Sequence, residues 1–225
     1  MIYSPTTKPE GTIRDWLNYH AKTTPNKTSY QFSDDGSELS WLDLLNRVKS
    51  IANYLVRLNI KKGESVAICM SNGCSALEIF YAIIYCGFRV TPLNLAAGPA
   101  ALGHAISHSK CNFVFFDESQ FEVLSNALNE TDAEPTVINV KNDTFNDNED
   151  NLLLDDILPE DHALLMYTSG TTGVPKGVVH THSSLLAGGW TTSIAHELKS
   201  TDRALCVLPL YHINGLCVTV IAPLI

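Results

Sequence analysis

Residues 62–92 read KGESVAICMSNGCSALEIFYAIIYCGFRVTP, and this stretch decides the fold class. Residues 65–70 form a short apolar run, which is typical of a buried strand. Residues 74–86 are a strongly apolar run of helical length that ends at Gly87, and a second short strand is expected at residues 89–91. Two short strands joined by a helix indicate a crossover unit, in which the strands lie parallel.

The same alternation continues on both sides of this unit. Upstream, apolar residues recur at helical spacing over residues 44–58, Ser40 with Asp43 resembles an N-terminal cap, and residues 61–63 are expected to stop the helix. Strands this apolar require helices on both faces, so we expect an α/β fold with mostly parallel sheets flanked by helices. Downstream, the sequence predicts a helix over residues 99–108, a strand over 112–116, a helix over 121–128 and a strand over 136–140.

A second α/β series begins at Ala163. Between the two series, the acidic, Asn-rich segment 141–161 predicts a surface loop. We therefore expect one α/β subdomain over residues 1–160, which includes this loop, and the start of a second over residues 161–225. The elements expected in the second series are a strand over residues 163–167, a loop over 168–176, an extended run over 177–180, a helix over 181–198 that starts near Ser183 or Ser184, a strand over 204–208 and the start of a buried helix over 214–225 that Pro223 would interrupt.

The composition is that of a globular protein: 225 residues, 45% of them hydrophobic and 17% charged. The net charge of -9 argues against a nucleic-acid partner. Fourteen acidic residues and one basic residue, Lys141, fall between Asp117 and Asp161, whereas the rest of the chain has ten acidic and fourteen basic residues. The surface outside the acidic stretch can therefore still attract an anionic ligand.

Neither a secretory signal nor a transmembrane segment is expected. The N-terminal residues MIYSPTTKPEG lack the basic and apolar regions of a signal peptide. The apolar stretches 75–90 and 204–225 are interrupted by charged or polar residues and prolines. The six cysteines show no C-x-x-C spacing and read as buried, reduced thiols. These features predict a cytoplasmic protein and leave a homodimer open.

Residues 167–177 read YTSGTTGVPKG and carry the chemistry. Glycines let the backbone approach a ligand closely, and hydroxyls with backbone N–H groups form an anion-binding concavity. Lys176 adds a mobile positive charge, so the segment offers what a polyphosphate needs. It is not a Walker A loop, because Pro175 stands where that pattern requires its second glycine and Gly177 follows the lysine. A P-loop NTPase or a kinase is therefore disfavoured.

The segment resembles the phosphate loop of adenylate-forming (AMP-binding) enzymes, which include acyl- and aryl-CoA synthetases, nonribosomal peptide adenylation domains and beetle luciferases. Three other stretches agree with that family in the right order: residues 62–68 (KGESVAI), residues 177–182 (GVVHTH), in which the family's histidine falls at His182, and residues 208–216 (LPLYHINGL). By this resemblance the chain is identified as a member of the acyl-/aryl-CoA synthetase branch. The resemblance implies the N-terminal portion of that family's large domain.

The resemblance also implies a reaction in two halves. A carboxylate attacks the α-phosphate of ATP to give acyl-AMP and pyrophosphate, and a thiol, usually that of CoA, then takes the acyl group. The ligands implied are ATP, a small carboxylic acid and CoA as the acceptor, with Mg²⁺ bound through ATP and contacted by Thr171 or Thr172. The implied contacts to the β- and γ-phosphates are Thr168, Ser169, Gly170, Thr171, Thr172 and Gly173, with Lys176 beside them.

Two residues take catalytic roles by the same resemblance, His212 near the attacking carboxylate and Lys176 beside the phosphates. The implied acyl pocket consists of Tyr211, His212, Asn214 and Gly215. The apolar run after His212 favours an aliphatic or aromatic acid over an amino acid, because no acidic partner for an ammonium group is visible there.

The chain lacks the family's adenine-packing motif, its ribose-binding aspartate, its hinge and its C-terminal lysine. We therefore expect an N-terminal fragment, without the C-terminal part and the lid domain, that binds ATP weakly and does not turn over. Two alternatives stay open. One is a non-catalytic nucleotide-binding or assembly module of the same fold, and the other is an adenylation domain that loads a carrier protein.

Other kinds of site find less support in the sequence. His104 and His108 stand four apart on an expected helix, but no third metal ligand is nearby, so a solvent-facing pair is the preferred interpretation. A serine hydrolase would require G-x-S-x-G, whereas Ser169 lies in T-S-G. The acidic tract lacks the spacing of an EF-hand.

Overall fold

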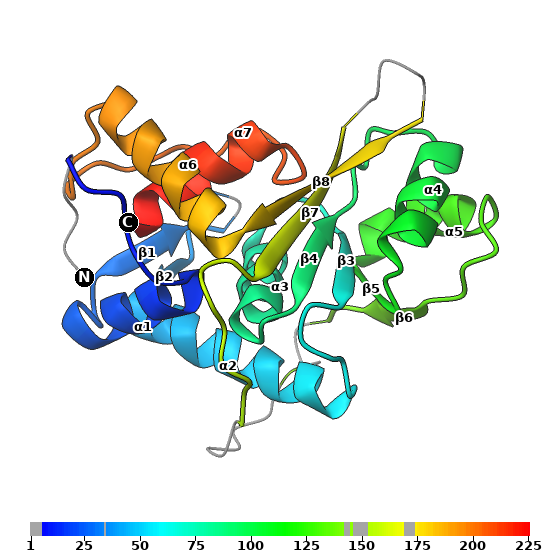
Figure 1. The fold of residues 1–225 in the computed structure, drawn as a ribbon, viewed down its shortest axis with the longest axis horizontal. Helices are drawn as coiled ribbons and strands as arrows, with labels where there is room; N and C mark the ends of the chain where they lie inside the picture. The colour runs from blue at the N-terminus through cyan, green and yellow to red at the C-terminus, as the bar shows by residue number, and fades with distance from the viewer. Residues whose placement is uncertain (1–5, 34, 142–144, 146–152, 169–173) are drawn as a thin grey trace.

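The computed structural model describes residues 6–33, 35–141, 145, 153–168 and 174–225. Six strands form one sheet in the order β6-β5-β3-β4-β7-β8 (Figure 1). Neighbouring strands pair in parallel, except that β7 and β8 pair antiparallel. The predicted α/β class with a mostly parallel sheet is confirmed. The strands are β3 (Ser65–Cys69), β4 (Arg89–Pro92), β5 (Phe113–Phe116), β6 (Thr136–Asn139), β7 (His162–Thr168) and β8 (Lys176–Thr181).

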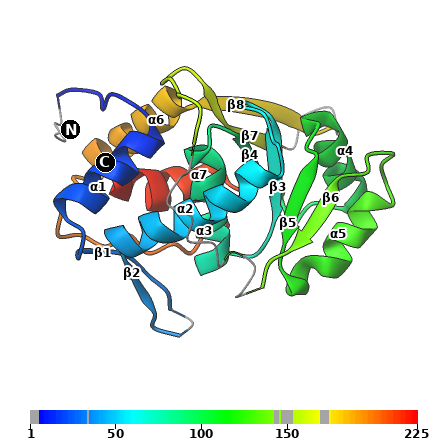
Figure 2. The ribbon, with the colours of Figure 1, turned by 90° about the horizontal axis from the view of Figure 1, so that it is seen from below.

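Helices cover both faces of this sheet because its inner strand β3 is apolar in both directions. Val66 and Ile68 point into the core beneath one pair of helices. Ala67 and Cys69 point the opposite way, into the core beneath the other pair. Figure 2 shows the two helix layers on opposite sides of the strands. The first pair is α2 (Trp41–Arg57) and α3 (Cys74–Tyr85), and the second is α4 (Pro99–Ser109) and α5 (Phe121–Leu128).

Helix α2 begins as the sequence predicts and ends earlier. Ser40 Oγ accepts a hydrogen bond from Asp43 N–H, and the Asp43 carboxylate accepts from Ser40 N–H, which completes a capping box. The predicted stop at residues 61–63 is wrong, because the helix ends at Arg57. Asn59 adopts a left-handed conformation (φ 55°) just beyond that end, and such a residue terminates a helix before any glycine is needed.

The N-terminal region contains elements that the periodicity of the sequence does not reveal. Thr12 and Asp15 form a capping box at the start of its helix. The helix packs beside α2, and the two strands form a separate antiparallel pair among the described strands (Figure 1). These elements are α1 (Ile13–Thr23), β1 (Thr28–Gln31) and β2 (Glu38–Ser40).

After β8 the chain forms a long helix and then a broken one. Thr181 caps the long helix together with Ser184, close to the predicted start. Gly189 allows this helix to approach the broken one, since a Cβ at Gly189 would lie 2.8 Å from Ile221 Cγ2. The predicted buried helix near the end is present in three short pieces. The elements are α6 (His182–Ala195), α7 (Ile213–Leu216), the π-helical turn η2 (Cys217–Ile221) and the 3-10 turn η3 (Ala222–Leu224).

The predicted strand over residues 204–208 is wrong. The segment forms no strand, and Leu205 and Val207 are 77% and 74% exposed. An apolar run becomes a strand only where a neighbouring strand accepts its backbone hydrogen bonds, and no strand of the described residues pairs with it.

Residues 153–161, at the end of the acidic segment, include a contact with the turn before β3. Residues 153–161 contain no helix or strand, and Lys62 Nζ lies 2.7 Å from Asp161 Oδ2. Residues 142–144 and 146–152 of the segment lie outside the described residues. The division at residue 160 stays a prediction, and the strands on its two sides share one sheet. Among the described residues, no helix has both the length and the apolar character that crossing a membrane requires.

His182 joins the first and last parts of the chain. It is fully buried at the start of α6, and its Nδ1 accepts a hydrogen bond from Ile13 N–H (3.3 Å). Its Nε2 has no hydrogen-bond partner among the described residues. Burial lowers the pKa of His182 to about 4, so the folded protein holds this imidazole neutral at physiological pH.

We predict that acid destabilises the fold through His182. An unfolded histidine has a pKa of about 6.5, so between about pH 6.5 and pH 4 the unfolded chain binds a proton that the folded chain excludes. As the pH falls through this window, the free energy of unfolding should decrease by up to about 3 kcal/mol. In His182→Asn, whose Oδ1 can accept from Ile13 N–H, this part of the pH dependence should vanish. Urea unfolding of both proteins from pH 4 to 7 measures how the free energy of unfolding depends on pH. If the two proteins give the same pH dependence, His182 is not its source.

Candidate functional site

The carboxyl ends of the parallel strands gather at one edge of the sheet. The connection from β3 leads to β4 on one side, whereas the connection from β5 leads to β6 on the other side, so the strand order reverses between β3 and β5. Open parallel sheets bind ligands in the crevice outside such a reversal. The topology therefore places the expected ligand site at this edge.

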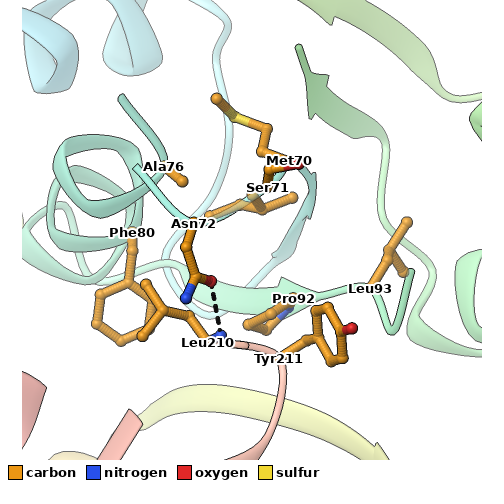
Figure 3. A pocket seen from close by; sticks show the side chains of 10 residues that line it. Met70, Ser71, Asn72, Ala76, Phe80, Pro92, Leu93, Leu210 and Tyr211 are labelled. Atoms are coloured by element: carbon orange, nitrogen blue, oxygen red, sulfur yellow. Dashed lines mark hydrogen bonds between the residues drawn. The ribbon is translucent and has the colours of Figure 1, made fainter. Parts of the chain in front are cut away.

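A small, mostly apolar pocket lies beyond the carboxyl ends of β3 and β4, next to this reversal (Figure 3). In Figure 3, Tyr211 lies beside Pro92 and Leu93, and Asn72 faces Leu210. The segment before α7 thus covers the carboxyl ends of β3 and β4. The residues that line the pocket are Ile68, Met70, Ser71, Asn72, Ala76, Phe80, Pro92, Leu93, Leu210 and Tyr211.

Asn72 holds this covering segment in place. Its Nδ2 donates to the Leu208 carbonyl oxygen (2.9 Å), and its Oδ1 accepts from Leu210 N–H (3.0 Å), so the two bonds lie on either side of Pro209. Helix α7 approaches the same turn closely, since a Cβ at Gly215 would lie 2.8 Å from the Pro209 carbonyl oxygen. One amide side chain and one glycine therefore fix the turn that leads into α7.

The residues predicted for the acyl pocket lie together at the start of α7. Tyr211 is half-buried and is the one of the four that lines the pocket. His212 is the N-cap of α7 and is exposed, and its ring lies 4.8 Å from that of Tyr211, edge to face. Asn214 is exposed and Gly215 is buried. Their roles toward an acid stay predictions.

Strands β7 and β8 bring the two ends of the predicted phosphate loop together. In their antiparallel register Thr168 stands opposite Lys176, and Thr168 Oγ1 donates to the Lys176 carbonyl oxygen (3.4 Å). Both residues are exposed. The described stem therefore presents one hydroxyl and one ammonium group at the end of the hairpin. The other predicted phosphate contacts lie outside the described residues: Ser169, Gly170, Thr171, Thr172 and Gly173.

The two groups of predicted residues share the carboxyl edge of the sheet. Tyr211 lies beside Pro92, the last residue of β4, and Thr168 is the last residue of β7, which pairs with β4. Among the described residues, no hydrogen bond or ion pair joins Tyr211 or His212 to Thr168 or Lys176. The structure places the two groups on neighbouring strands without a direct bond between them.

Helix α4 carries two histidines that reach the hairpin stem. His104 is half-buried and its Nε2 lies 3.2 Å from the Pro175 carbonyl oxygen. His108 is exposed and its Nδ1 lies 2.8 Å from the Tyr167 hydroxyl. The predicted solvent-facing pair is therefore wrong for His104. The spacing of four residues shows that the two side chains share a helix face. The sequence does not show that this face meets the β7–β8 stem, because Tyr167 and Pro175 lie 59 and 71 residues further along the chain.

The described residues contain no group of three or more His, Cys, Asp or Glu side chains that could hold a metal ion. Contact of Thr171 or Thr172 with Mg²⁺ stays a prediction, since both residues lie outside the described ranges.

Comparison with known proteins agrees with this arrangement. A family model described as "AMP-binding enzyme" matches residues 17–225. The chain belongs to the AMP-binding enzyme family. This AMP-binding chain is 33% identical over 227 residues to sulfoacetate–CoA ligase of Cupriavidus necator, with 97% of the chain and 45% of that protein covered. It is 30% identical over 212 residues to 2-succinylbenzoate–CoA ligase of Oceanobacillus iheyensis, with 91% and 41% covered. The chain thus spans less than half the length of these relatives.

Solved structures share the fold of this AMP-binding chain. The inhibitor-bound N-terminal domain of FACL13 from Mycobacterium tuberculosis superposes with a TM-score of 0.85 at 24% identity, over 95% of this chain and 55% of that one. O-succinylbenzoate Coenzyme A synthetase from Bacillus subtilis, in complex with AMP, gives a TM-score of 0.81 at 23% identity, over 97% and 54%. The predicted N-terminal portion of the family's large domain is therefore confirmed as the fold.

We predict that Asn72→Ala loosens the turn before α7. Amide hydrogen exchange at Leu210 should speed up roughly tenfold, because its N–H loses the side-chain acceptor. Asn72→Asp keeps that acceptor but loses the donor to the Leu208 carbonyl oxygen. Its Leu210 amide should therefore exchange faster than in the wild type and more slowly than in Asn72→Ala. Exchange followed by NMR in the three proteins measures this. Equal exchange rates at Leu210 would show that Asn72 does not hold the turn.

Proposed function

We propose that the chain is the N-terminal part of an ATP-dependent carboxylic acid:CoA ligase. The observation that carries the proposal is the hairpin stem at the carboxyl edge of the sheet. There Thr168 stands opposite Lys176 at the two ends of a loop rich in hydroxyls and glycines. Membership of the AMP-binding enzyme family and similarity to two CoA ligases support it.

The first half-reaction sets the demands on the hairpin. A carboxylate oxygen attacks the α-phosphorus of ATP and pyrophosphate leaves, so negative charge on the leaving phosphates must be neutralised. The ammonium group of Lys176 is exposed and forms no ion pair among the described residues, so it is available for this task. The Thr168 hydroxyl adds a donor from the opposite strand. Mg²⁺ enters as part of Mg-ATP, with Thr171 or Thr172 as the proposed contact.

The acid is proposed to bind beside α7. His212 is exposed at the start of that helix, where its ring can contact the attacking carboxylate, and Tyr211 supplies an apolar wall. Asn214 and Gly215 complete the proposed pocket. In the second half-reaction the CoA thiol attacks the acyl carbon and AMP leaves. Sulfoacetate and 2-succinylbenzoate, the acids in the names of the two relatives, are the first substrates to try.

The proposal includes a cytoplasmic location. The six cysteines of the chain are free, and three of them, Cys69, Cys86 and Cys111, are buried, as expected for thiols that stay reduced. A homodimer stays a prediction.

Two proteins test the proposal together: the 225-residue chain, and the same chain extended by any coding sequence downstream of residue 225. We expect the shorter protein to bind Mg-ATP weakly and to release no pyrophosphate. The extended protein should release pyrophosphate and form an acyl-CoA with a fitting acid. ATP binding without acyl-AMP formation in the extended protein would favour a non-catalytic module. Transfer to a carrier protein but not to CoA would favour a loading domain.

We predict that Lys176→Ala in the extended protein lowers the rate of acid-dependent pyrophosphate release by about 100-fold. The leaving phosphates then lose a cation that water cannot replace in a closed site. Thr168→Ala should lower the rate less than Lys176→Ala does. Thr168→Ser retains the hydroxyl and should therefore keep most of the wild-type rate. Lys199→Ala, at another exposed lysine, is the control and should leave the rate unchanged. A Lys176→Ala protein with the wild-type rate would remove the phosphate role of this stem.

A further inference from the structure

The β7–β8 hairpin reaches beyond the strand beside it. Strand β7 is in register with β4 at one pair, Leu164 opposite Val90, whereas its pairing with β8 continues to Thr168 opposite Lys176. In Figure 1 the two strands run past the end of β4 toward the region of α4. The sheet therefore supports the base of the hairpin, and its outer end needs support from another element.

Helix α4 provides that support through one bond on each side of the loop. The His104 imidazole donates from Nε2 to the Pro175 carbonyl oxygen (3.2 Å), because a carbonyl can only accept. His108 Nδ1 is hydrogen-bonded to the Tyr167 hydroxyl (2.8 Å). Tyr167 directly precedes the last residue of β7, and Pro175 directly precedes the first residue of β8.

The three aromatic side chains form one packed group. The rings of His104 and His108 lie 5.4 Å apart at 27°, and the Tyr167 ring stands at 84° to both, at 6.3 and 5.7 Å. Burial raises the pKa of Tyr167 to about 12, so its hydroxyl keeps its proton and stays able to hydrogen-bond with His108 Nδ1. The contact therefore combines edge-on packing with a directional bond.

Helix α4 is itself fixed against α5. Gly103 lies so close to α5 that a Cβ there would sit 2.7 Å from the Ala127 carbonyl oxygen. Ala105 and Ile106, between the two histidines, are buried in the core of that face of the sheet. The hairpin stem is therefore bonded to an element that is held in place by close packing, so a shift of the stem breaks its bonds to α4.

We propose that His104 and His108 are positioning residues for the phosphates of ATP. Each binds a residue next to a predicted phosphate contact, Lys176 for His104 and Thr168 for His108. By fixing the two sides of the stem, the pair sets the separation of an ammonium and a hydroxyl group on which the grip of a polyphosphate depends. The inference rests on the proposed function.

A double-mutant cycle tests the bond between His108 and Tyr167. His108→Phe and Tyr167→Phe each remove the hydrogen bond and keep a ring in place. In the extended protein, each should raise the KM for ATP roughly three- to tenfold, the size of one lost hydrogen bond, and the double variant should raise it no further. The KM values for the acid and for CoA should stay within about twofold of wild type, which a general loss of structure would not allow.

The role of His104 is tested by a conservative replacement. His104→Gln keeps an N–H donor for the Pro175 carbonyl oxygen and should bind Mg-ATP nearly as wild type does. His104→Phe loses the donor and should bind it several-fold more weakly. His196→Phe, at the exposed end of α6, is the matched control and should change nothing. Thermal unfolding of each variant establishes that it is folded.

Three outcomes overturn the inference. Unchanged ATP constants in His108→Phe and Tyr167→Phe show that the bond does not position the stem for ATP. Additive losses in the double variant show that the two side chains act separately. If the wild-type protein binds no ATP, the proposed function fails, and the inference falls with it. Amide exchange in the β7–β8 stem then shows whether the histidines brace the hairpin for some other purpose.

Discussion

The burial of β3 on both faces is the constraint on which the rest of the structure depends. Every residue of this strand is buried, and Val66 and Ala67, which face opposite ways, are both fully covered. A strand in that position needs helices on both sides, and helical crossovers make its neighbours parallel. Parallel strands end at the same edge, so the turns that follow β3, β4 and β7 collect there. The site is thus a consequence of how one apolar strand is covered.

At this edge, hydrogen bonds from a few polar side chains hold the turns. Asn72 lies in the turn between β3 and α3 and bonds the backbone on both sides of Pro209. His104 and His108 project from a helix and bond the two sides of the β7–β8 stem. The histidine bonds join a packed helix to the stem, and the Asn72 bonds join two turns. The sheet therefore sets where the candidate site lies, and a few hydrogen bonds set its geometry.

Local patterns predict the elements of the sheet, because apolar runs and helix caps are visible within one stretch of chain. The phosphate role of residues 168–176, which rests on dense glycines and hydroxyls, stays a prediction. The strand expected at residues 204–208 fails since a strand depends on a partner elsewhere in the sequence. The spacing of apolar residues does not reveal helix α1, although Thr12 and Asp15 form a capping box that the sequence contains. The bonds of Asn72 to Leu210 and of His104 to Pro175 join positions 138 and 71 apart, so no local pattern reveals them.

The most direct test of the account maps the nucleotide on the protein itself. Amide and imidazole chemical shifts are recorded as Mg-ATP is added to the 225-residue chain. If the carboxyl edge holds ATP, shifts are expected at the two ends of the hairpin stem, Thr168 and Lys176, and on the face of α4 that carries His104 and His108. Shifts confined to the amino ends of the strands or to residues 153–161, or no shifts at all, would contradict the claim that the carboxyl edge holds ATP.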